Sequence, residues 1–263
     1  MIIIKPNRKI EGVYKNQKKY INTLVNFFAR NKSKIIEDVL MIYDRMQAAK
    51  ARVDARLQEL LAQLNLNVFE ELIKDTEGNY KNTAEIILKT NLRVLRKYVS
   101  QEEFDRMFSL IDRWALQYAQ EKSAGLVGKR WIGGRLVDAK KKGWRIDEAT
   151  RELLKQDIAE AISEGWSTQT LRKVLAENYA FSRARADMIA RTETNFVYTF
   201  AQKKSWQESG VVKFKVWLIS EDPCELCMEN AETGEMPIDT DFPNGDPPVH
   251  PNCTCDLAAV IKM

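Results

Sequence analysis

Proline is almost absent from most of this sequence. Pro6 is the only proline before position 223, and the other six lie between Pro223 and Pro251. Because proline breaks the interior of a helix, the long proline-free stretch is free to be helical. The proline-rich end should instead form a looped structure.

Long apolar runs are also missing. The longest ones fall far short of the roughly 20 residues that a membrane-spanning helix needs. The apolar start at residues 1–4 is too short for a secretory signal and has no small-residue cleavage site behind it. We therefore expect a protein made in the cytoplasm that does not enter a membrane. Its 263 residues, 44% of them hydrophobic, suffice for one large or two modest domains.

Histidine and cysteine are rare, and they occur close together. The single histidine is His250, and the four cysteines all lie between Cys224 and Cys255. Four cysteines are few for a secreted disulfide scaffold of this length. Their crowding favours a metal site.

Basic residues are absent from positions 216–261, where ten acidic residues give a charge of −10. Residues 1–215 hold 40 of the 41 basic and 27 of the 37 acidic residues, a net charge of +13. A polyanion should therefore meet the body of the chain and not its C-terminal module.

The body begins with a helical pattern. Its spacing of alternating three- and four-residue steps predicts a long helix over about 15–64. The apolar stripe is wider than a coiled-coil seam, which favours a helix packed inside an α-helical domain over a self-associating coiled coil. The seam residues are Ile36, Val39, Tyr43, Met46, Lys50, Val53, Leu57, Leu60 and Leu64, and the residues that widen it are Ile35, Leu40, Ile42 and Leu61.

Further helices are predicted over 68–73, 83–98 and 101–122. Ser100 and Glu103 have the spacing of a capping box, in which each side chain satisfies a backbone donor of the first turn.

Three helices and a strand are predicted after position 146. The helices open at Asp147, Ser167 and Ser182, and Gly165 and Gly210 are placed to end the first and third. Apolar residues that alternate over 212–218 then predict a strand with one buried face.

A glycine-rich basic segment separates these two groups of helices. Its glycines predict a flexible loop, and two tryptophans, Trp131 and Trp144, lie among its charges. Such a loop could contact a nucleic-acid backbone. Clusters of lysine and arginine are a pattern of low specificity, however, so a solvated linker or a loop ordered by a protein partner is the preferred interpretation. The candidate contact residues are Lys129, Arg130, Arg135, Lys140, Lys141, Lys142 and Arg145.

The predicted strand leads directly into a metal-ligand pattern. Cys224 and Cys227 have C-x-x-C spacing, and His250 with Cys253 supplies a second pair some twenty residues later. A tetrahedral Zn²⁺ ion needs four such nitrogen and sulfur ligands. Cys255 is the alternative to Cys253, and a site of four cysteines without His250 is a further option. A labile disulfide or a C-x-x-C redox pair are the competing interpretations.

Such a site is structural. Four protein ligands fill the coordination sphere, so no position is left for a catalytic water. The acidic surroundings disfavour DNA binding by this module, and a nuclease of the H-N-H kind would need a second histidine.

Several separated motifs resemble the phage Mu protein F-like family of head-morphogenesis, or minor capsid, proteins. They occur in the family's order over about 140–260: the run Ile189-Ala-Arg191-Thr-Glu193-Thr, Val216-Trp217, Asp222-Pro-Cys224-x-x-Cys227, Gly234, and Pro247-Pro-Val-His250-Pro-Asn-Cys253-Thr-Cys255. In that family the last cysteine of the final motif is the looser position, which favours Cys253 over Cys255 as a ligand. Thr254 departs from the family's usual arginine.

The resemblance implies a low-copy virion protein at the portal vertex. Its expected partners are the portal protein, the major capsid protein or scaffold, and double-stranded DNA through the basic body, with roles in head morphogenesis and in DNA packaging or ejection. Self-association is a further expectation. Arg191 and Glu193 match the family's A-R-T-E run, but at i and i+2 they cannot face each other and should pair with other groups.

Two other functions compete with the structural one. An enzyme such as a nuclease or ADP-ribosyl transferase would use Arg191, Glu193 and the metal, and a DNA-binding packaging factor would use residues 129–145. We expect no enzymatic activity. The expected fold is mainly α: a helical region at 1–125, a glycine-rich basic linker at 126–145, and a small α+β module at 146–263 with a zinc-stapled loop within 211–260.

Overall fold

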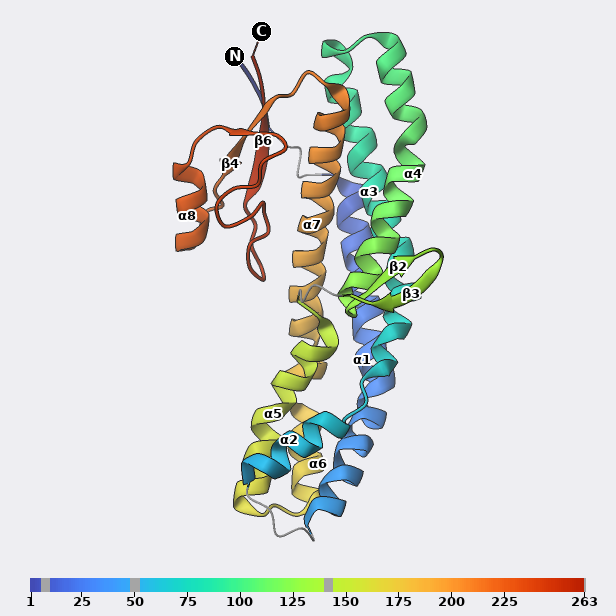
Figure 1. The fold of residues 1–263 in the computed structure, drawn as a ribbon, viewed down its shortest axis with the longest axis vertical. Coiled ribbons are helices and arrows are strands. Elements are labelled where there is room, and N and C mark those ends of the chain that lie inside the picture. The colour runs from blue at the N-terminus through green and yellow to red at the C-terminus, as the bar shows by residue number, and fades with distance from the viewer. Residues whose placement is uncertain (6–9, 48–52, 140–143, 263) are drawn as a thin grey trace. The chain divides into compact units, whose positions relative to one another are not determined.

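The computed structural model describes residues 1–5, 10–47, 53–139 and 144–262 (Figure 1). It forms two compact units: residues 1–20, 77–119 and 188–263 make the first, and residues 21–76 and 120–187 make the second. The predicted fold class is confirmed, because the chain is mainly helical and a small sheet forms near its C-terminus. The elements in chain order are β1 (Ile2–Ile4), α1 (Glu11–Gln47), α2 (Val53–Gln63), η1 (Asn67–Glu71), α3 (Leu72–Leu95), η2 (Arg96–Tyr98), α4 (Gln101–Leu126), β2 (Lys129–Ile132), β3 (Arg135–Asp138), α5 (Ile146–Glu164), α6 (Thr168–Glu177), η3 (Tyr179–Phe181), α7 (Arg183–Ser209), β4 (Phe214–Leu218), α8 (Glu225–Glu232), β5 (Met236–Pro237) and β6 (Asp256–Ile261).

The prediction of one helix over 15–64 is wrong, because the structure has two helices, α1 and α2. Helix α2 packs against α5, and the Arg151 guanidinium donates to the carbonyls of Leu61 and Leu64 at its C-terminal end. These contacts hold α2 as a separate element. Lys50, the polar member of the predicted seam, lies outside the described residues.

The apolar stripe of α1 is buried within the chain itself. Both the narrow seam (Val39, Tyr43) and the residues that widen it (Leu40, Ile42) are at most 4% exposed. The Tyr43 hydroxyl hydrogen-bonds to the carbonyls of Ala161 and Trp166, at 2.8 and 2.9 Å. This is the packing of a helix inside an α-helical domain.

No helix in the described ranges is long and apolar enough to cross a membrane.

Helices α3 and α4 are longer than expected. The two segments predicted at 68–73 and 83–98 belong to η1, α3 and η2, which follow one another without a break. Within α3 the Thr76 hydroxyl donates to the Leu72 carbonyl, so its polar group is satisfied inside the helix. Ser100 caps α4 as predicted, since its hydroxyl accepts from the Glu103 backbone N–H at 3.1 Å.

Residues 129–138 of the basic segment form a β-hairpin and not a loop. Gly125 lies within α4, and β2 then pairs with β3 in the register Lys129↔Asp138 to Ile132↔Arg135. The two-residue turn is Gly133-Gly134, with φ of 55° and 74°. Turns of this kind match the twist of paired strands and need positive φ at both positions, which glycine adopts without strain.

The serine caps of α6 and α7 and the glycine that ends α5 are confirmed, whereas Asp147 does not cap α5, because it lies inside the helix and its carboxylate pairs with Arg145. Helix α5 begins at Ile146, beside Asp147, and ends at Gly165, whose φ is 66°. Ser167 accepts from the Thr170 N–H to cap α6, and Ser182 accepts from the Arg185 N–H at the start of α7. Each of these side chains satisfies a donor that the first helical turn leaves unpaired.

The sheet belongs to the first unit, and its strand order is β1-β6-β4-β5. Strand β4 was predicted, whereas β1, β5 and β6 were not. All neighbouring strands are antiparallel, and every residue of β6 is buried. The pairing of β1 with β6 places the two ends of the chain side by side (Figure 1).

Candidate metal centre

The sheet brings the two halves of the cysteine and histidine pattern together. Strands β4 and β6 pair with Leu218 opposite Asp256, so the end of β4 lies beside the beginning of β6. The chain that leaves β4 reaches Cys224 at the start of α8, and the chain that enters β6 comes from Cys255. Antiparallel pairing therefore joins segments about thirty positions apart in the sequence.

Five potential ligands gather at this end of the sheet. The ligand atoms of Cys224, Cys227 and His250 lie within 4.8 Å of one another, and so do those of Cys227, Cys253 and Cys255. Cys227 belongs to both groups and is fully buried in α8. Its Sγ atom lies 3.6 Å from Nε2 of His250 and 3.8 Å from Sγ of Cys253. Cysteine sulfurs and a histidine nitrogen at these separations could hold one metal ion.

The histidine ring is oriented for this role. Nδ1 of His250 lies 2.8 Å from the Pro251 carbonyl oxygen, which can only accept a hydrogen bond. Nδ1 is therefore the donor of this bond, and Nε2 faces Cys227. A metal-binding histidine ordinarily donates its second ring N–H to such an oxygen, so this donor set fits a metal ion.

Helix α7 holds the ligand loop through a row of polar side chains. The Asn195 side-chain amide donates to the carbonyls of Cys253 and Cys255, at 2.9 and 3.2 Å. The Thr192 hydroxyl accepts from the backbone N–H of Asn252, and the Thr199 hydroxyl donates to the Pro247 carbonyl. Positions 192, 195 and 199 share one face of a helix.

A second set of contacts holds the loop that follows α8. Asn230, completely buried, donates to the Gly245 carbonyl at 3.1 Å and accepts from the Asn244 N–H at 3.0 Å. Nearby, Nζ of Lys215 lies 2.6 Å from both carboxylate oxygens of Asp246. Burial lowers the pKa of Lys215, while the ion pair with Asp246 opposes that change. Lys215 of β4 thus compensates the charge of Asp246, one of the ten acidic residues at positions 216–261.

The thiols differ in their electrostatic surroundings. Burial raises the pKa of the Cys227 and Cys253 thiols. Burial acts in the same direction on Cys255, but several hydrogen bonds, those with Ser220 first among them, together outweigh it and leave the pKa of Cys255 lowered. A bound cation would reverse the effect of burial, because it stabilises the thiolate form that binds metal.

Glu193 of the A-R-T-E run is part of a buried hydrogen-bond network. The Tyr80 hydroxyl donates to its carboxylate at 2.9 Å and shares a 2.7 Å hydrogen bond with the Tyr20 hydroxyl. Glu193 is only 2% exposed, whereas Arg191 is exposed. This carboxylate therefore fixes the packing of α1, α3 and α7 within the first unit, and a substrate in solvent cannot reach it.

The basic residues of 129–145 are already partly paired. Lys129 lies 3.0 Å from carboxylate oxygens of Glu70 and of Asp138, and the Arg145 guanidinium lies 2.5 Å from Asp147. Arg130 and Arg135 lie on the hairpin, and Lys140, Lys141 and Lys142 fall outside the described residues. Half of the described basic candidates thus neutralise acids of their own unit, which weakens the argument for DNA contact there.

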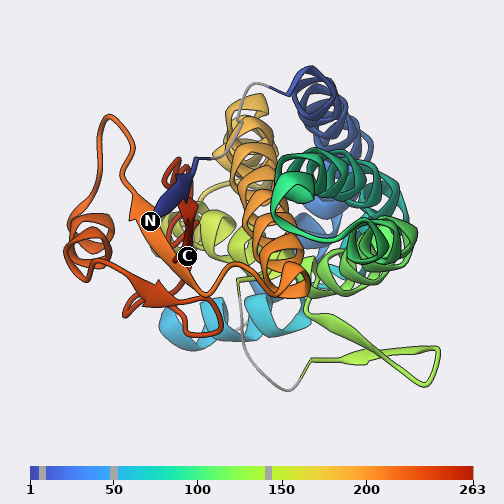
Figure 2. The same ribbon diagram turned by 90° about the horizontal axis from the view of Figure 1, so that it is seen from above.

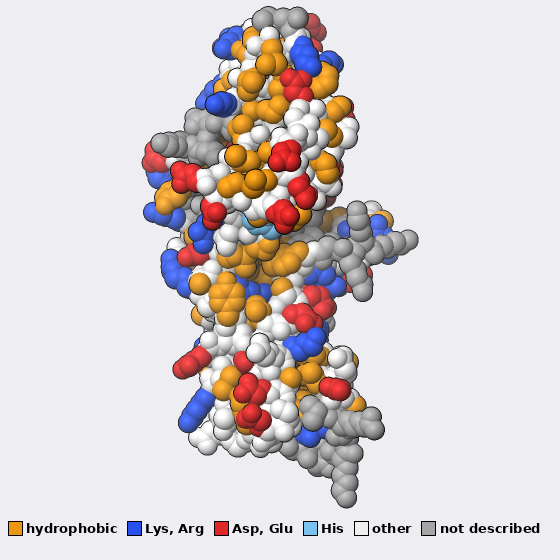
Figure 3. Space-filling model, turned by 90° about the vertical axis from the view of Figure 1, so that its left-hand side faces the viewer, with side chains coloured by type: hydrophobic (Ala, Val, Ile, Leu, Met, Phe, Trp, Pro, Cys, Tyr) orange, Lys and Arg blue, Asp and Glu red, His pale blue; other side chains and the backbone are white. Residues whose placement is uncertain are grey.

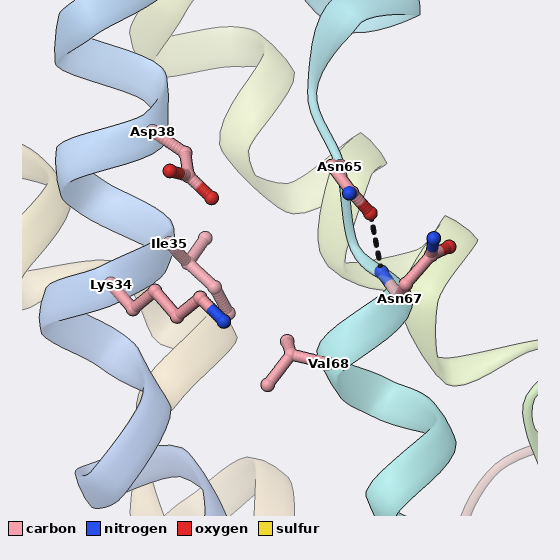
Figure 4. A pocket seen from close by; sticks show the side chains of 6 residues that line it. All are labelled: Lys34, Ile35, Asp38, Asn65, Asn67 and Val68. Atoms are coloured by element: carbon pink, nitrogen blue, oxygen red, sulfur yellow. Dashed lines mark hydrogen bonds between the residues drawn. The ribbon is translucent and has the colours of Figure 1, made fainter.

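Two hollows of the surface are small. One, of about 90 Å³, lies between α1 and the segment before α3, where the Asn67 N–H donates to the Asn65 side chain (Figure 4). The other, of about 190 Å³, lies beside the metal ligands, and its lining includes Tyr14, Tyr198 and Cys253. Both are smaller than the roughly 300 to 1,000 Å³ of ordinary small-molecule sites.

The cysteine and histidine spacings pointed to the potential ligands, which the structure brings together, but gave no sign of the residues that hold their loop. Thr192, Asn195, Thr199 and Asn230 carry no motif, and their role depends on a loop fifteen to sixty positions away. The one signal in the sequence is that the polar positions 192, 195 and 199 fall on one face of the predicted helix.

Comparison with protein families gives one match. Residues 152–258 match the family model described as Phage Mu protein F like protein. Neither the curated proteins nor the solved structures gave a match to this chain.

Proposed function

We propose that this chain, whose residues 152–258 belong to the phage Mu protein F-like family, is a structural head-morphogenesis protein of a tailed bacteriophage. The observation that carries the proposal is the extent of the match. It runs from α5 into β6, and therefore includes α7 and all five potential metal ligands.

The protein acts at the portal vertex as a minor component of the head. Its partners in this role are the portal protein and the major capsid protein or scaffold, and it is located in the virion. The net charge of +13 on residues 1–215 suits a body that also meets double-stranded DNA during packaging or ejection, because lysine and arginine displace the counterions of the phosphate backbone.

The metal of the centre is zinc, and its role is structural. Thiolate and imidazole ligands are those that tetrahedral structural zinc sites use, and the five donors exceed the four that the ion needs. A coordination sphere filled by the protein has no open position for a substrate or a reactive water. We therefore expect no enzymatic activity. The role of zinc is to hold together the end of β4, helix α8 and the loop before β6.

Head assembly with and without the chain tests this function. The gene would be deleted from the phage that encodes it and restored with an affinity tag, and heads would be separated from tails by sedimentation. We expect the tagged chain to co-sediment with heads at low copy number, and deletion to reduce the yield of DNA-filled heads. A chain that stays outside the particles while heads form and fill normally would refute the proposal.

Purified protein tests the absence of enzymatic activity. Nuclease and ADP-ribosyl transferase assays, each with and without chelator, should give no turnover. Activity that is lost in Glu193→Ala while the circular dichroism spectrum is retained would contradict a purely structural role.

A further inference from the structure

The β2–β3 hairpin ends in an exposed tip that carries large apolar side chains. Residues 131–135 are all exposed, and Trp131 and Ile132 show 41% and 50% of their surface. Figures 1 and 2 show the paired strands as a two-stranded ribbon that follows the C-terminal end of α4. Apolar side chains of this size on an exposed ribbon are typical of a surface that binds another protein.

One face of the ribbon is both apolar and basic. Residues opposite each other in an antiparallel pair point to the same face, and Arg130 pairs with Val137 as Ile132 pairs with Arg135. This face therefore presents two arginines around Ile132. Within the described residues neither arginine forms an ion pair, in contrast to Lys129 on the opposite face.

The outward face of α8 has the complementary composition. Glu225, Met228, Glu229 and Glu232 follow one another at steps of three, one and three, so they share one side of the helix. All four are exposed, Met228 by 49% of its surface. No described lysine or arginine forms an ion pair with these three glutamates. Figure 3, which faces the side on which α8 lies, shows acidic side chains beside hydrophobic ones.

We propose that the hairpin of one copy of this chain docks on the α8 face of a second copy. Each surface has an apolar residue between charges, and the charges are of opposite sign. The charges on the two surfaces are also spaced at similar distances. Arg130 and Arg135 lie diagonally across the hairpin, and such neighbours are roughly 7 to 8 Å apart. Glu225 and Glu229 are roughly 6 Å apart along the axis of α8, and Glu225 and Glu232 roughly 10 Å.

The contact is heterologous, because the two surfaces are different. Each copy keeps one free hairpin and one free α8 face after it pairs, so the assembly can grow into a ring or a short chain. A second copy suits this face better than DNA does, since Ile132 gains nothing from a phosphate backbone, whereas Met228 on α8 offers apolar surface.

Charge reversal in matched pairs tests this contact. The hairpin variant is Arg130→Glu with Arg135→Glu, and the α8 variant is Glu225→Lys with Glu232→Lys. The control, Lys173→Glu with Arg183→Glu, makes the same charge change at exposed helical positions of the hairpin's unit. Molar mass against concentration would be measured by analytical ultracentrifugation, and circular dichroism and metal content would verify that each variant is folded.

We expect the wild-type chain and the control to associate, and half-molar salt to weaken that association at least about tenfold, since it screens exposed charges. Each interface variant alone should be monomeric. An equimolar mixture of the two should associate again, because every hairpin then meets an α8 face of opposite charge.

Other outcomes overturn the proposal. These are a monomeric wild-type chain at about 100 µM, far above the micromolar dissociation constants of ordinary weak interfaces, variants that associate like the control, and a mixture that stays monomeric. A hairpin variant whose only defect is weaker binding to a DNA duplex would assign the hairpin to nucleic acid instead.

Discussion

The Tyr80 hydroxyl gives the sharpest test of how the first unit is held together. It donates to the Glu193 carboxylate and shares a hydrogen bond with the Tyr20 hydroxyl, and all three groups are at most 2% exposed. Tyr80→Phe keeps the ring but removes both bonds. A hydrogen bond to a charged group contributes about 1.5 to 3 kcal/mol and a neutral one about 1 kcal/mol, so we expect a loss of about 3 kcal/mol in the free energy of unfolding.

The matched control is Tyr118→Phe. The Tyr118 hydroxyl is buried without a hydrogen-bond partner in the described structure, while its ring stacks on Phe200 with centroids 4.0 Å apart. Phenylalanine preserves the stacking and removes an unsatisfied group, so the free energy of unfolding should stay within about 0.5 kcal/mol or rise. Urea unfolding followed by circular dichroism measures both variants. Equal losses would show that the network contributes nothing specific, and the reasoning would be wrong.

Three further predictions concern the metal centre and the buried tyrosines. Asn195→Ala should weaken metal binding about tenfold or more, since it frees the carbonyls beside the ligands; competition with a chromophoric chelator measures this, and unchanged affinity would contradict it. Cys253→Ser should lose the bound metal while Cys255→Ser retains it, as elemental analysis would show; the reverse result would make Cys255 the fourth ligand. Burial raises the pKa of Tyr20 and Tyr80 well above the unfolded value of about 10, so the stability they contribute is complete below pH 10 and falls as the pH rises further. Their phenolate absorbance should therefore appear only together with unfolding, and titration of these tyrosines in the folded protein would refute that assignment.

Local signals in the sequence predicted most of the helical ends. Ser100, Ser167 and Ser182 bond to backbone N–H groups within three positions, and Gly165 and Gly210 adopt positive φ where their helices stop. Such interactions depend only on near neighbours, which is why the sequence reveals them. The C-x-x-C and H-x-x-C spacings are local in the same sense.

Pairings between distant segments could not be predicted in this way. Strand β1 has three residues, and β6 gains its partners only when residues 2–4 and 214–218 come beside it. The glycines of the basic segment predict a loop because they break helices, but a tight hairpin turn requires the same residues. Helices α1 and α2 both bury an apolar face, so the repeat of apolar residues in the sequence runs on from one helix to the other and predicts a single helix.

Zinc content is the measurement that tests the central claim most directly. The purified chain should contain one zinc ion per molecule, and Cys227→Ser should contain none, because Cys227 belongs to both groups of potential ligands. Removal of the metal should melt residues 211–260 and leave the circular dichroism of the helical body largely unchanged. A wild-type chain that folds fully without any bound metal would contradict the account.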